Sequence, residues 1–298
     1  MSALIINIHS KMRSINRKYL IGISWFIISL LISILNDTSM KYLSGNLPPM
    51  QITFLRFCFG CLSLVPFMLY FGKQAFRTER AWIHFARGLI LFLAMSIWCY
   101  GLTIVPIAHA TLTTFTMPLF VLVLAPIFLK EKISSTLIIA TVLGFLGAVI
   151  SFDVMHVDFE ITSMILLLSA LFFASLDIIN KKFVKKESML SMLFYSALVT
   201  SLLGAFPAYL VWQTPSFNDL MILLYLGAGG NLILYCLLKA FNFVPASSIA
   251  PYRYLELIFS SAVGFAIFSE IPSLMMIAGS LLIIPTTLFI TFAKPKEA

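Results

Sequence analysis

The stretch Ala250–Phe268 reads APYRYLELIFSSAVGFAIF and places an arginine and a glutamate directly before a largely apolar run. Whether Arg253 and Glu256 lie in water or in lipid decides the fold. The chain of 298 residues is 60% hydrophobic and only 11% charged, whereas a soluble domain carries about a quarter charged residues. This composition is typical of an integral membrane protein, so both charges are expected inside a membrane span.

Apolar runs of about 20 residues recur along the whole chain, and a helix needs about that length to cross roughly 30 Å of hydrocarbon. The runs are continuous rather than alternating, which favours helices over transmembrane strands. The sequence therefore predicts an all-α integral membrane protein with ten spans. They are Tyr19–Leu43, Met50–Phe71, Trp82–Thr103, Ile107–Leu129, Ser134–Phe152, Ile161–Phe183, Met189–Trp212, Phe217–Phe241, Pro245–Phe268 and Leu274–Phe292.

The lysines and arginines gather on alternate connections between these spans. If the N-terminus is cytoplasmic, 15 of the 20 basic residues fall in inside segments, and Lys41 alone falls outside. This asymmetry predicts cytoplasmic N- and C-termini in a bacterial inner membrane, with residues 1–18 as a cytoplasmic segment. The net charge of +8 follows from these loops and is no nucleic-acid signature.

The two halves of the chain resemble each other. Shifts of 140 and 139 residues align identical residues in order, and each half then holds five spans. The matches are Ser29 with Ser169, Leu31 with Leu171, Asp37 with Asp177, Lys41 with Lys181, Gly88 with Gly227, Pro106 with Pro245 and Glu131 with Glu270. An odd number of spans inverts the second copy, so we predict inverted repeats over residues 19–152 and 161–292, a pattern typical of secondary transporters.

Other classes of membrane protein fit less well. An intramembrane hydrolase would need a nucleophile with a base or a metal cluster, and the chain has no H-E-x-x-H, G-x-S-x-G or P-loop motif. A channel would need a ring of like charges or a carbonyl filter, and no such feature is evident. We therefore expect a transporter with a small-molecule substrate, without catalytic residues, a metal or a cofactor. Monomer and homodimer both remain open.

Each half closes its fourth span with an acidic residue, in Phe-Leu-Lys-Glu131 and Ile-Phe-Ser-Glu270. With two five-helix halves and short loops, the whole chain resembles the drug/metabolite transporter superfamily in its EamA-type ten-helix branch. Three strings resemble the S-adenosylmethionine uptake transporters of rickettsia-like intracellular bacteria. They are LDIINKKFVKKESMLSMLFYSA (Leu176–Ala197), APYRYLEL (Ala250–Leu257) and IIPTTLFI (Ile283–Ile290).

This resemblance implies import of S-adenosylmethionine across the inner membrane, with antiport against S-adenosylhomocysteine as one mode. The alternative is an exporter of drugs or amino-acid metabolites with the same fold. In an α-helix that starts near Pro245, Arg253 lies roughly 12 Å deep and Glu256 roughly 16 Å deep. Ionisable groups at that depth are costly and are functional candidates by default.

Helical geometry places Tyr252, Arg253, Glu256 and Ser260 on one face of the ninth span. For a zwitterion with a sulfonium group, Glu256 can offset a positive charge, Tyr252 can add a cation–π contact and Arg253 can hold the carboxylate. The alternative is a structural ion pair between Arg253 and Glu256, three residues apart on the same helix. Both interpretations stay open at the level of sequence.

Weaker candidates lie on other spans. Asp37 with Lys41 and Asp177 with Lys181 occupy opposite membrane faces after inversion, so they are candidate gating pairs or ordinary helix-end pairs. Arg56 is a candidate carboxylate anchor, or a side chain that reaches the outer surface. The remaining substrate-binding candidates are Trp98, Tyr100 and Tyr235 for stacking on a base, Thr111 and Thr114 on the fourth span, and Asn231 beside a glycine cluster.

Overall fold

A computed structural model describes residues 2–104, 112–152, 163–268 and 271–292, and these residues contain helices and no strand. The helices are α1 (Ser2–Ser44), α2 (Pro49–Phe71), α3 (Lys73–Phe76), α4 (Ala81–Ile104), α6 (Met117–Leu129), α7 (Ser135–Ser151), α8 (Ser163–Phe183), α9 (Met189–Leu210), α10 (Phe217–Phe243), α11 (Ala246–Ile249), a 3₁₀ helix (Ala250–Tyr254), α12 (Leu255–Phe268) and α13 (Leu274–Phe292).

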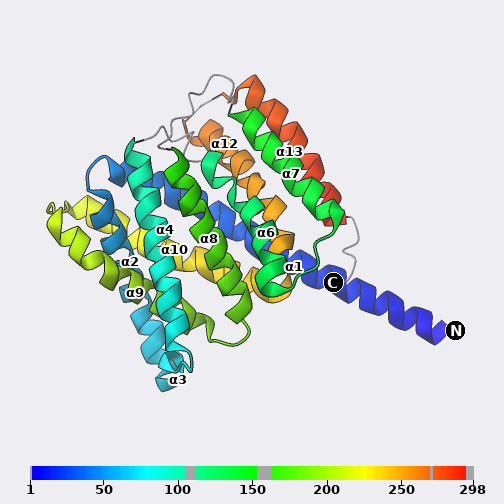
Figure 1. The fold of residues 1–298 in the computed structure, drawn as a ribbon, viewed down its shortest axis with the longest axis horizontal. Coiled ribbons are helices and arrows are strands. Elements are labelled where there is room, and N and C mark those ends of the chain that lie inside the picture. The colour runs from blue at the N-terminus through cyan, green and yellow to red at the C-terminus, as the bar shows by residue number, and fades with distance from the viewer. Residues whose placement is uncertain (1, 105–111, 153–162, 269–270, 293–298) are drawn as a thin grey trace.

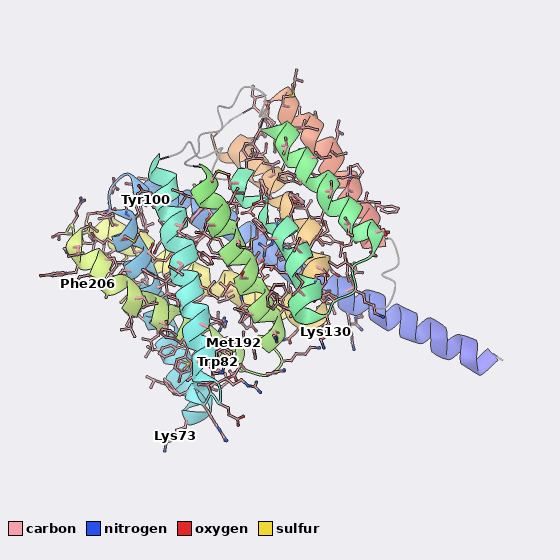
Figure 2. The ribbon with its side chains drawn as sticks, viewed as in Figure 1. Lys73, Trp82, Tyr100, Lys130, Met192 and Phe206 are labelled. Atoms are coloured by element: carbon pink, nitrogen blue, oxygen red, sulfur yellow. The ribbon has the colours of Figure 1, made fainter. Side chains whose placement is uncertain are left out.

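The predicted architecture of ten transmembrane helices is confirmed. Eight helical segments of the described chain are long and apolar enough to cross a membrane, and α7 is a shorter apolar helix. The remaining span is broken into α11, the 3₁₀ helix and α12. Large apolar side chains point outward, as expected for a surface that faces lipid; Phe206, for example, is 69% exposed (Figure 2).

Helix packing is symmetric between the two five-helix halves. Helix α2 packs on α9, and α7 packs on α13 at the opposite edge of the bundle (Figure 1). The other main contacts come in matched pairs: α1 on α10 with α8 on α4, α2 on α10 with α9 on α4, and α6 on α8 with α12 on α1. Exchanging the halves maps each contact onto its counterpart, as expected for inverted repeats.

Equivalent hydrogen bonds at the two ends of the bundle have the same symmetry. Gln51, at the start of α2, donates to the carbonyl oxygen of Gln213 after α9 at 2.5 Å. Ser191, the counterpart of Gln51 under the 140-residue shift, donates to the carbonyl oxygen of Ala75 after α2 at 2.6 Å. Each half thus ties the start of its second span to the end of the other half's second span.

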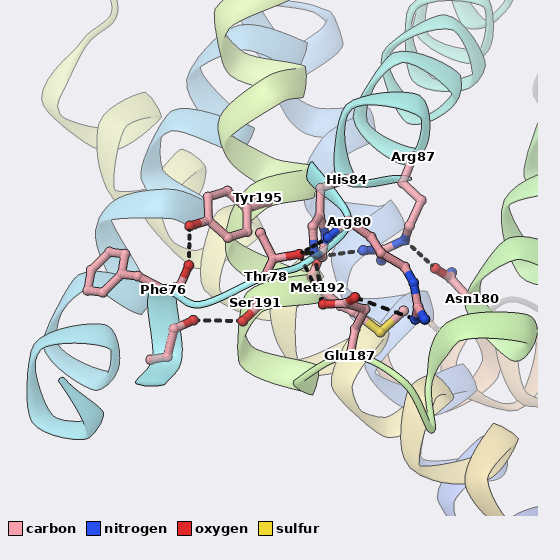
Figure 3. A network of polar contacts seen from close by, with 11 residues as sticks. Phe76, Thr78, Arg80, His84, Arg87, Asn180, Glu187, Ser191, Met192 and Tyr195 are labelled. Atoms are coloured by element: carbon pink, nitrogen blue, oxygen red, sulfur yellow. Dashed lines mark hydrogen bonds and ion pairs between the residues drawn. The ribbon is translucent and has the colours of Figure 1, made fainter. Parts of the chain in front are cut away.

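A polar network joins the loop before α4 to the start of α9 (Figure 3). The buried carboxylate of Glu187 lies 3.8 Å from Arg80 and 3.5 Å from His84, and it accepts a hydrogen bond from Thr78 at 3.1 Å. Because these loops bring the ends of α2, α4, α8 and α9 together, the network fixes one end of the bundle.

Close packing of α2 on α10 brings two backbones together beside the centre of the bundle. A Cβ atom added at Gly227 would lie 2.5 Å from the amide nitrogen of Gly60 and 2.7 Å from the carbonyl oxygen of Arg56. Only glycine permits this approach, since real Cβ contacts are not that short. The contact places Arg56 against α10, next to the cavity described below.

Candidate functional site

The break in the ninth span orients the charged residues of APYRYLEL. Pro251 has no amide hydrogen to continue the turns of α11, and the chain from Ala250 to Tyr254 winds as a 3₁₀ helix instead. Because this helix turns about 120° per residue, neighbouring side chains separate further than in an α-helix. Tyr252 and Arg253 therefore face different neighbours, although uniform α-helical geometry would place both on one face.

Arg253 forms its ion pair with Asp177 of α8. Its Nη2 atom donates to Asp177 Oδ2, and the two side chains are 16% and 7% exposed. The guanidinium also lies 5.4 Å from the centre of the Phe26 ring on α1. Among the ion pairs between described residues, Arg253 pairs with Asp177 and not with Glu256. The pair neutralises two charges inside the membrane and joins the second half's first and fourth spans.

A cavity of about 260 Å³ lies between the two halves and opens onto this ion pair. That volume is slightly below the range for ligand pockets, about 300–1,000 Å³. Residues of α1, α2, α4, α6, α8, α9, α10 and α12 line it, so both repeats contribute. Its charged lining residues are Asp37, Arg56, Asp177, Arg253 and Glu256.

Three of these five charged groups, Asp37, Arg56 and Glu256, do not take part in the Asp177–Arg253 ion pair. The side chain of Asp37 is exposed to the cavity and accepts a hydrogen bond from Ser33 at 3.3 Å. Arg56 donates to the sulfur of Met40 at 3.2 Å, and its Nε atom has no partner among the described residues. Glu256 completes the set. Two carboxylates and one guanidinium group thus face a site enclosed in the membrane.

Neutral side chains complete the lining. Trp98, Phe57 and Phe173 supply aromatic surface, and Thr114 lies on the fourth span. The amide nitrogen of Asn231 donates to the carbonyl oxygen of Gly60 at 2.7 Å and to Ser63 at 3.0 Å, which ties α10 to α2. The site therefore combines a charged region with aromatic walls.

Eight of the predicted site residues line this cavity, and several others lie elsewhere. The eight are Asp37, Arg56, Trp98, Thr114, Asp177, Asn231, Arg253 and Glu256. Tyr252 is 2% exposed and its hydroxyl group contacts Tyr19 at 3.3 Å and Thr291 at 2.7 Å, so it joins α1 and α13. Ser260 donates to the carbonyl oxygen of Leu257 within its own helix.

Two predicted stacking residues lie outside the cavity lining. Tyr235 packs edge-on against Trp25 at 6.1 Å and lies 5.4 Å from the ammonium group of Lys239. Tyr100 is 49% exposed at the end of α4 (Figure 2). Thr111 lies outside the described residues.

Neither lysine of the predicted gating pairs is among the described residues that line the cavity. Lys181 donates to the carbonyl oxygens of Phe241 and Val244, both at 2.6 Å, at the end of α10. A cation at this position stabilises the C-terminal end of a helix. The side chain of Lys41 lies outside the described residues.

Sequence reasoning missed Asn180 and Ser196, which both line the cavity. Asn180 follows Asp177 by one helical turn, so the two share a face of α8. Arg87, which is fully buried on α4, donates from Nε to Asn180 Oδ1 at 2.8 Å and from Nη1 to the carbonyl oxygen of Met192 at 2.9 Å (Figure 3). The position of Asn180 one helical turn after the candidate acid Asp177 was the signal in the sequence that could have identified it.

Several known proteins are similar to this chain in sequence. Residues 20–152 and 161–292 both match the model of the EamA-like transporter family. An S-adenosylmethionine uptake transporter of Rickettsia conorii is 47% identical over 94% of this chain and 95% of its own length. A riboflavin transporter of Vibrio cholerae is 25% identical over 96% and 97% of the two chains. A pseudopaline exporter of Pseudomonas aeruginosa is 26% identical over 86% and 90%.

A solved crystal structure shares the fold. It superposes with a TM-score of 0.75 over 93% of this chain and 96% of its own, at 17% sequence identity. At that identity the likeness bears on the arrangement of the helices and not on the ligand.

Proposed function

The chain belongs to the EamA-like transporter family, and on that premise we propose that it imports S-adenosylmethionine across the bacterial inner membrane by alternating access. The protein is a multi-pass membrane transporter of a small molecule and not an enzyme. The similarity to the Rickettsia transporter favours this substrate, and the charges in the cavity carry the argument.

The formal charge of the cavity complements that of the proposed substrate. Its lining holds three carboxylates and two guanidinium groups, which leaves one excess negative charge. S-adenosylmethionine carries a sulfonium, an ammonium and a carboxylate group, and so has one excess positive charge at neutral pH. Bringing such a ligand into a low-dielectric site neutralises the site as a whole, which limits the cost of burying the charges of both.

Each open charge has a proposed partner in the substrate. Asp37 and Glu256 offset the sulfonium and ammonium groups, and Arg56 binds the carboxylate through its planar guanidinium. Arg56 replaces Arg253 in this role because Arg253 is committed to Asp177. Trp98 and Phe173 offer aromatic faces to the base. The proposed unit is one chain, alone or within a homodimer, because helices of both its halves enclose the cavity.

We propose that both termini are cytoplasmic. Lys73 and Lys130 lie toward the lower side of the bundle in Figure 2, whereas Tyr100 lies at the upper end of α4. The lower side then faces the cytoplasm, where positively charged loops are enriched. A cysteine introduced at Lys185 should resist a membrane-impermeant thiol reagent applied from the periplasm. Labelling of that cysteine in intact cells would contradict this orientation.

Uptake of labelled S-adenosylmethionine by proteoliposomes that contain the purified chain tests the substrate. We expect saturable accumulation that unlabelled S-adenosylmethionine competes and riboflavin does not. Glu256→Gln should reduce it strongly, whereas Glu79→Gln, at a position that is 78% exposed in its loop, should not. Accumulation no greater than in protein-free vesicles would contradict import. Release from preloaded vesicles without uptake would favour the exporter alternative. That alternative is supported by the similarity of this chain to a pseudopaline exporter.

A further inference from the structure

The contact between Arg87 and Asn180 fixes the orientation of an amide group at the cavity. A guanidinium group can only donate hydrogen bonds, so the atom of Asn180 that meets Arg87 Nε at 2.8 Å is the acceptor Oδ1. Its amide nitrogen Nδ2 then points the other way, and it has no partner among the described residues. Because Asn180 is fully buried and lines the cavity, this nitrogen is an uncommitted donor at the site.

Two features strengthen this donor. Arg87 is itself fully buried and is held a second time by the carbonyl oxygen of Met192 at 2.9 Å, so the amide cannot turn over without breaking a charge-assisted bond (Figure 3). The adjacent positive charge also polarises the amide, which makes its N–H groups better donors.

The surroundings of Asn180 differ from the charged region around Asp37, Arg56 and Glu256. One helical turn away on α8 lie Leu176 and Asp177, whose charge is paired with Arg253, and Leu193 of α9 and Leu91 of α4 line the same cavity. Ser196 of α9 also lines it, and its hydroxyl group has no partner among the described residues. A neutral donor between leucine side chains and an ion pair that is already neutralised suits a flat heteroaromatic ring with acceptor nitrogens on its edge.

We infer that Asn180 determines specificity by donating a hydrogen bond to a ring nitrogen of the substrate's purine base, and that Arg87 is the positioning residue that holds the amide in donor orientation. This inference rests on the proposed function, because it assigns the base of S-adenosylmethionine to the α4–α8–α9 side of the cavity. The charged groups of the substrate then lie toward α1, α2 and α12.

The test uses ligands in which one ring nitrogen at a time is replaced by C–H. Binding of S-adenosylmethionine and of its 1-deaza, 3-deaza and 7-deaza forms is measured on the purified full-length chain. We expect one deaza form to bind about three- to tenfold more weakly than the parent, the range for one neutral hydrogen bond. Equal binding of all three deaza forms would overturn the inference and leave the proposed function intact. A chain that binds no S-adenosylmethionine would overturn both.

The variant Asn180→Asp tests whether the weaker binding of one deaza form is due to Asn180. Aspartate has the same shape and still accepts from Arg87, so the variant is expected to fold, but it presents an acceptor to the cavity in place of the N–H donor. The deaza form that loses affinity in the wild type should then bind as well as the parent does. A loss that persists unchanged in Asn180→Asp would assign the hydrogen bond to another residue and overturn the inference.

Variants of Arg87 and Asn231 separate positioning from general structural effects. Arg87→Lys keeps a buried donor beside Asn180, so one deaza form should still bind more weakly than the parent. Arg87→Met lets the amide turn over, so the three deaza forms and the parent should bind with similar affinity. We call the difference in affinity among the four ligands the deaza pattern. Asn231→Leu is the matched control, because its amide nitrogen is committed to Gly60 and Ser63. We expect it to change the affinity for all four ligands by the same factor. A deaza pattern that survives in Arg87→Met would exclude the positioning role.

Discussion

Asp37 and Asp177 occupy equivalent positions in the two repeats but have opposite surroundings. Asp177 is 5% exposed and paired with Arg253, whereas Asp37 is exposed to the cavity and accepts a hydrogen bond from Ser33. Under the shift of 139 residues, the position equivalent to Arg253 in the first half is Thr114. The repeat supplied the same acid twice, and only the second half supplies the arginine that neutralises it.

Arg56, which lines the same cavity as Asp37, has no cationic counterpart either. Under the shift of 140 residues, Arg56 corresponds to Ser196, which carries no charge. The second half therefore holds a closed ion pair that joins α8 to the 3₁₀ helix, and the first half holds an acid and an arginine that remain open to a ligand. The symmetric scaffold thus carries an asymmetric site, and we propose that Asp177 serves stability and Asp37 serves binding.

The largest expected effect comes from removing the charge of Asp177. Asp177→Asn leaves Arg253 without its counter-ion inside the membrane, and breaking a buried pair in this way costs about 3–5 kcal/mol. We expect a strong loss of thermal stability in detergent and poor expression. Asp37→Asn, the matched change in the other repeat, should keep the protein folded and instead weaken S-adenosylmethionine binding.

The double variant Asp177→Asn/Arg253→Met sharpens this comparison, because it removes both charges together. It should recover much of the stability that Asp177→Asn loses. If Asp37→Asn and Asp177→Asn lowered the unfolding temperature equally, the two acids would have the same role and the comparison would fail.

A smaller effect, on binding, is expected at Glu256. Glu256→Gln keeps the size and removes the charge, so the affinity for the sulfonium ligand should fall by about 1.5–3 kcal/mol, or roughly ten- to 150-fold. Because Arg253 has its ion pair with Asp177, stability should change little. Binding is measured per folded molecule alongside thermal unfolding. Unchanged affinity with lost stability would make Glu256 a structural residue.

The sequence predicted the scaffold well because its physical basis is local or periodic. Runs such as Phe217–Phe241 must be helical in lipid, since only helices satisfy every backbone group within a single segment. The repeat was visible in positions such as Asp37 and Asp177. All five charged residues of the cavity lining were also predicted as candidates, because each intramembrane charge is conspicuous in an apolar run.

The partners of these charges could not be predicted from the sequence. Helical geometry correctly places Arg253 and Glu256 on the same cavity, but it does not show that Arg253 pairs with Asp177 in a distant span. Tyr252 is likewise held by Tyr19 and Thr291, which lie far from it in the sequence. Asn180 escaped notice because its role depends on Arg87, which lies 93 residues earlier in the chain. Contacts between distant segments are set by tertiary packing, which periodicity does not encode.

The next largest expected effect is the loss of stability when equivalent glycines of the two repeats, Gly88 and Gly227, are replaced by alanine. A Cβ atom at Gly227 would meet three backbone atoms of α2 at 2.5, 2.7 and 2.8 Å, whereas a Cβ atom at Gly88 would meet the Cβ and Cγ1 atoms of Val199 at 2.4 and 2.6 Å. Overpacking typically costs 1–3 kcal/mol, and three close backbone atoms leave less room to relax than one valine, whose Cγ1 can rotate although its Cβ moves only with its helix. We expect Gly227→Ala to destabilise more than Gly88→Ala in thermal unfolding. The reverse order would mean that the α4–α9 contact is the more rigid of the two.

The smallest expected effect concerns the turn between α10 and α11, where two charged residues hold backbone groups. Lys181 donates to the carbonyl oxygens of Phe241 and Val244, and Glu131 accepts from the amide nitrogens of Ala246 and Ser247 at 2.9 and 3.0 Å. Lys181→Met removes the cation and keeps an apolar side chain of similar length. Because Lys181 is only partly buried, solvent can take over some of these contacts, and we expect a loss of about 1 kcal/mol.

This last change also tests whether Lys181 acts in gating. The lysine does not line the cavity, so equilibrium binding of S-adenosylmethionine should stay within about twofold of wild type. If the turn must open and close during transport, the uptake rate in proteoliposomes should change by more than binding does, because the stability of one access state is altered. An uptake rate equal to that of wild type, with the small loss of stability, would leave Lys181 as a helix-end stabiliser. In that case gating at the α10–α11 turn would have to rest on Glu131, whose carboxylate would still hold the start of α11 in the variant.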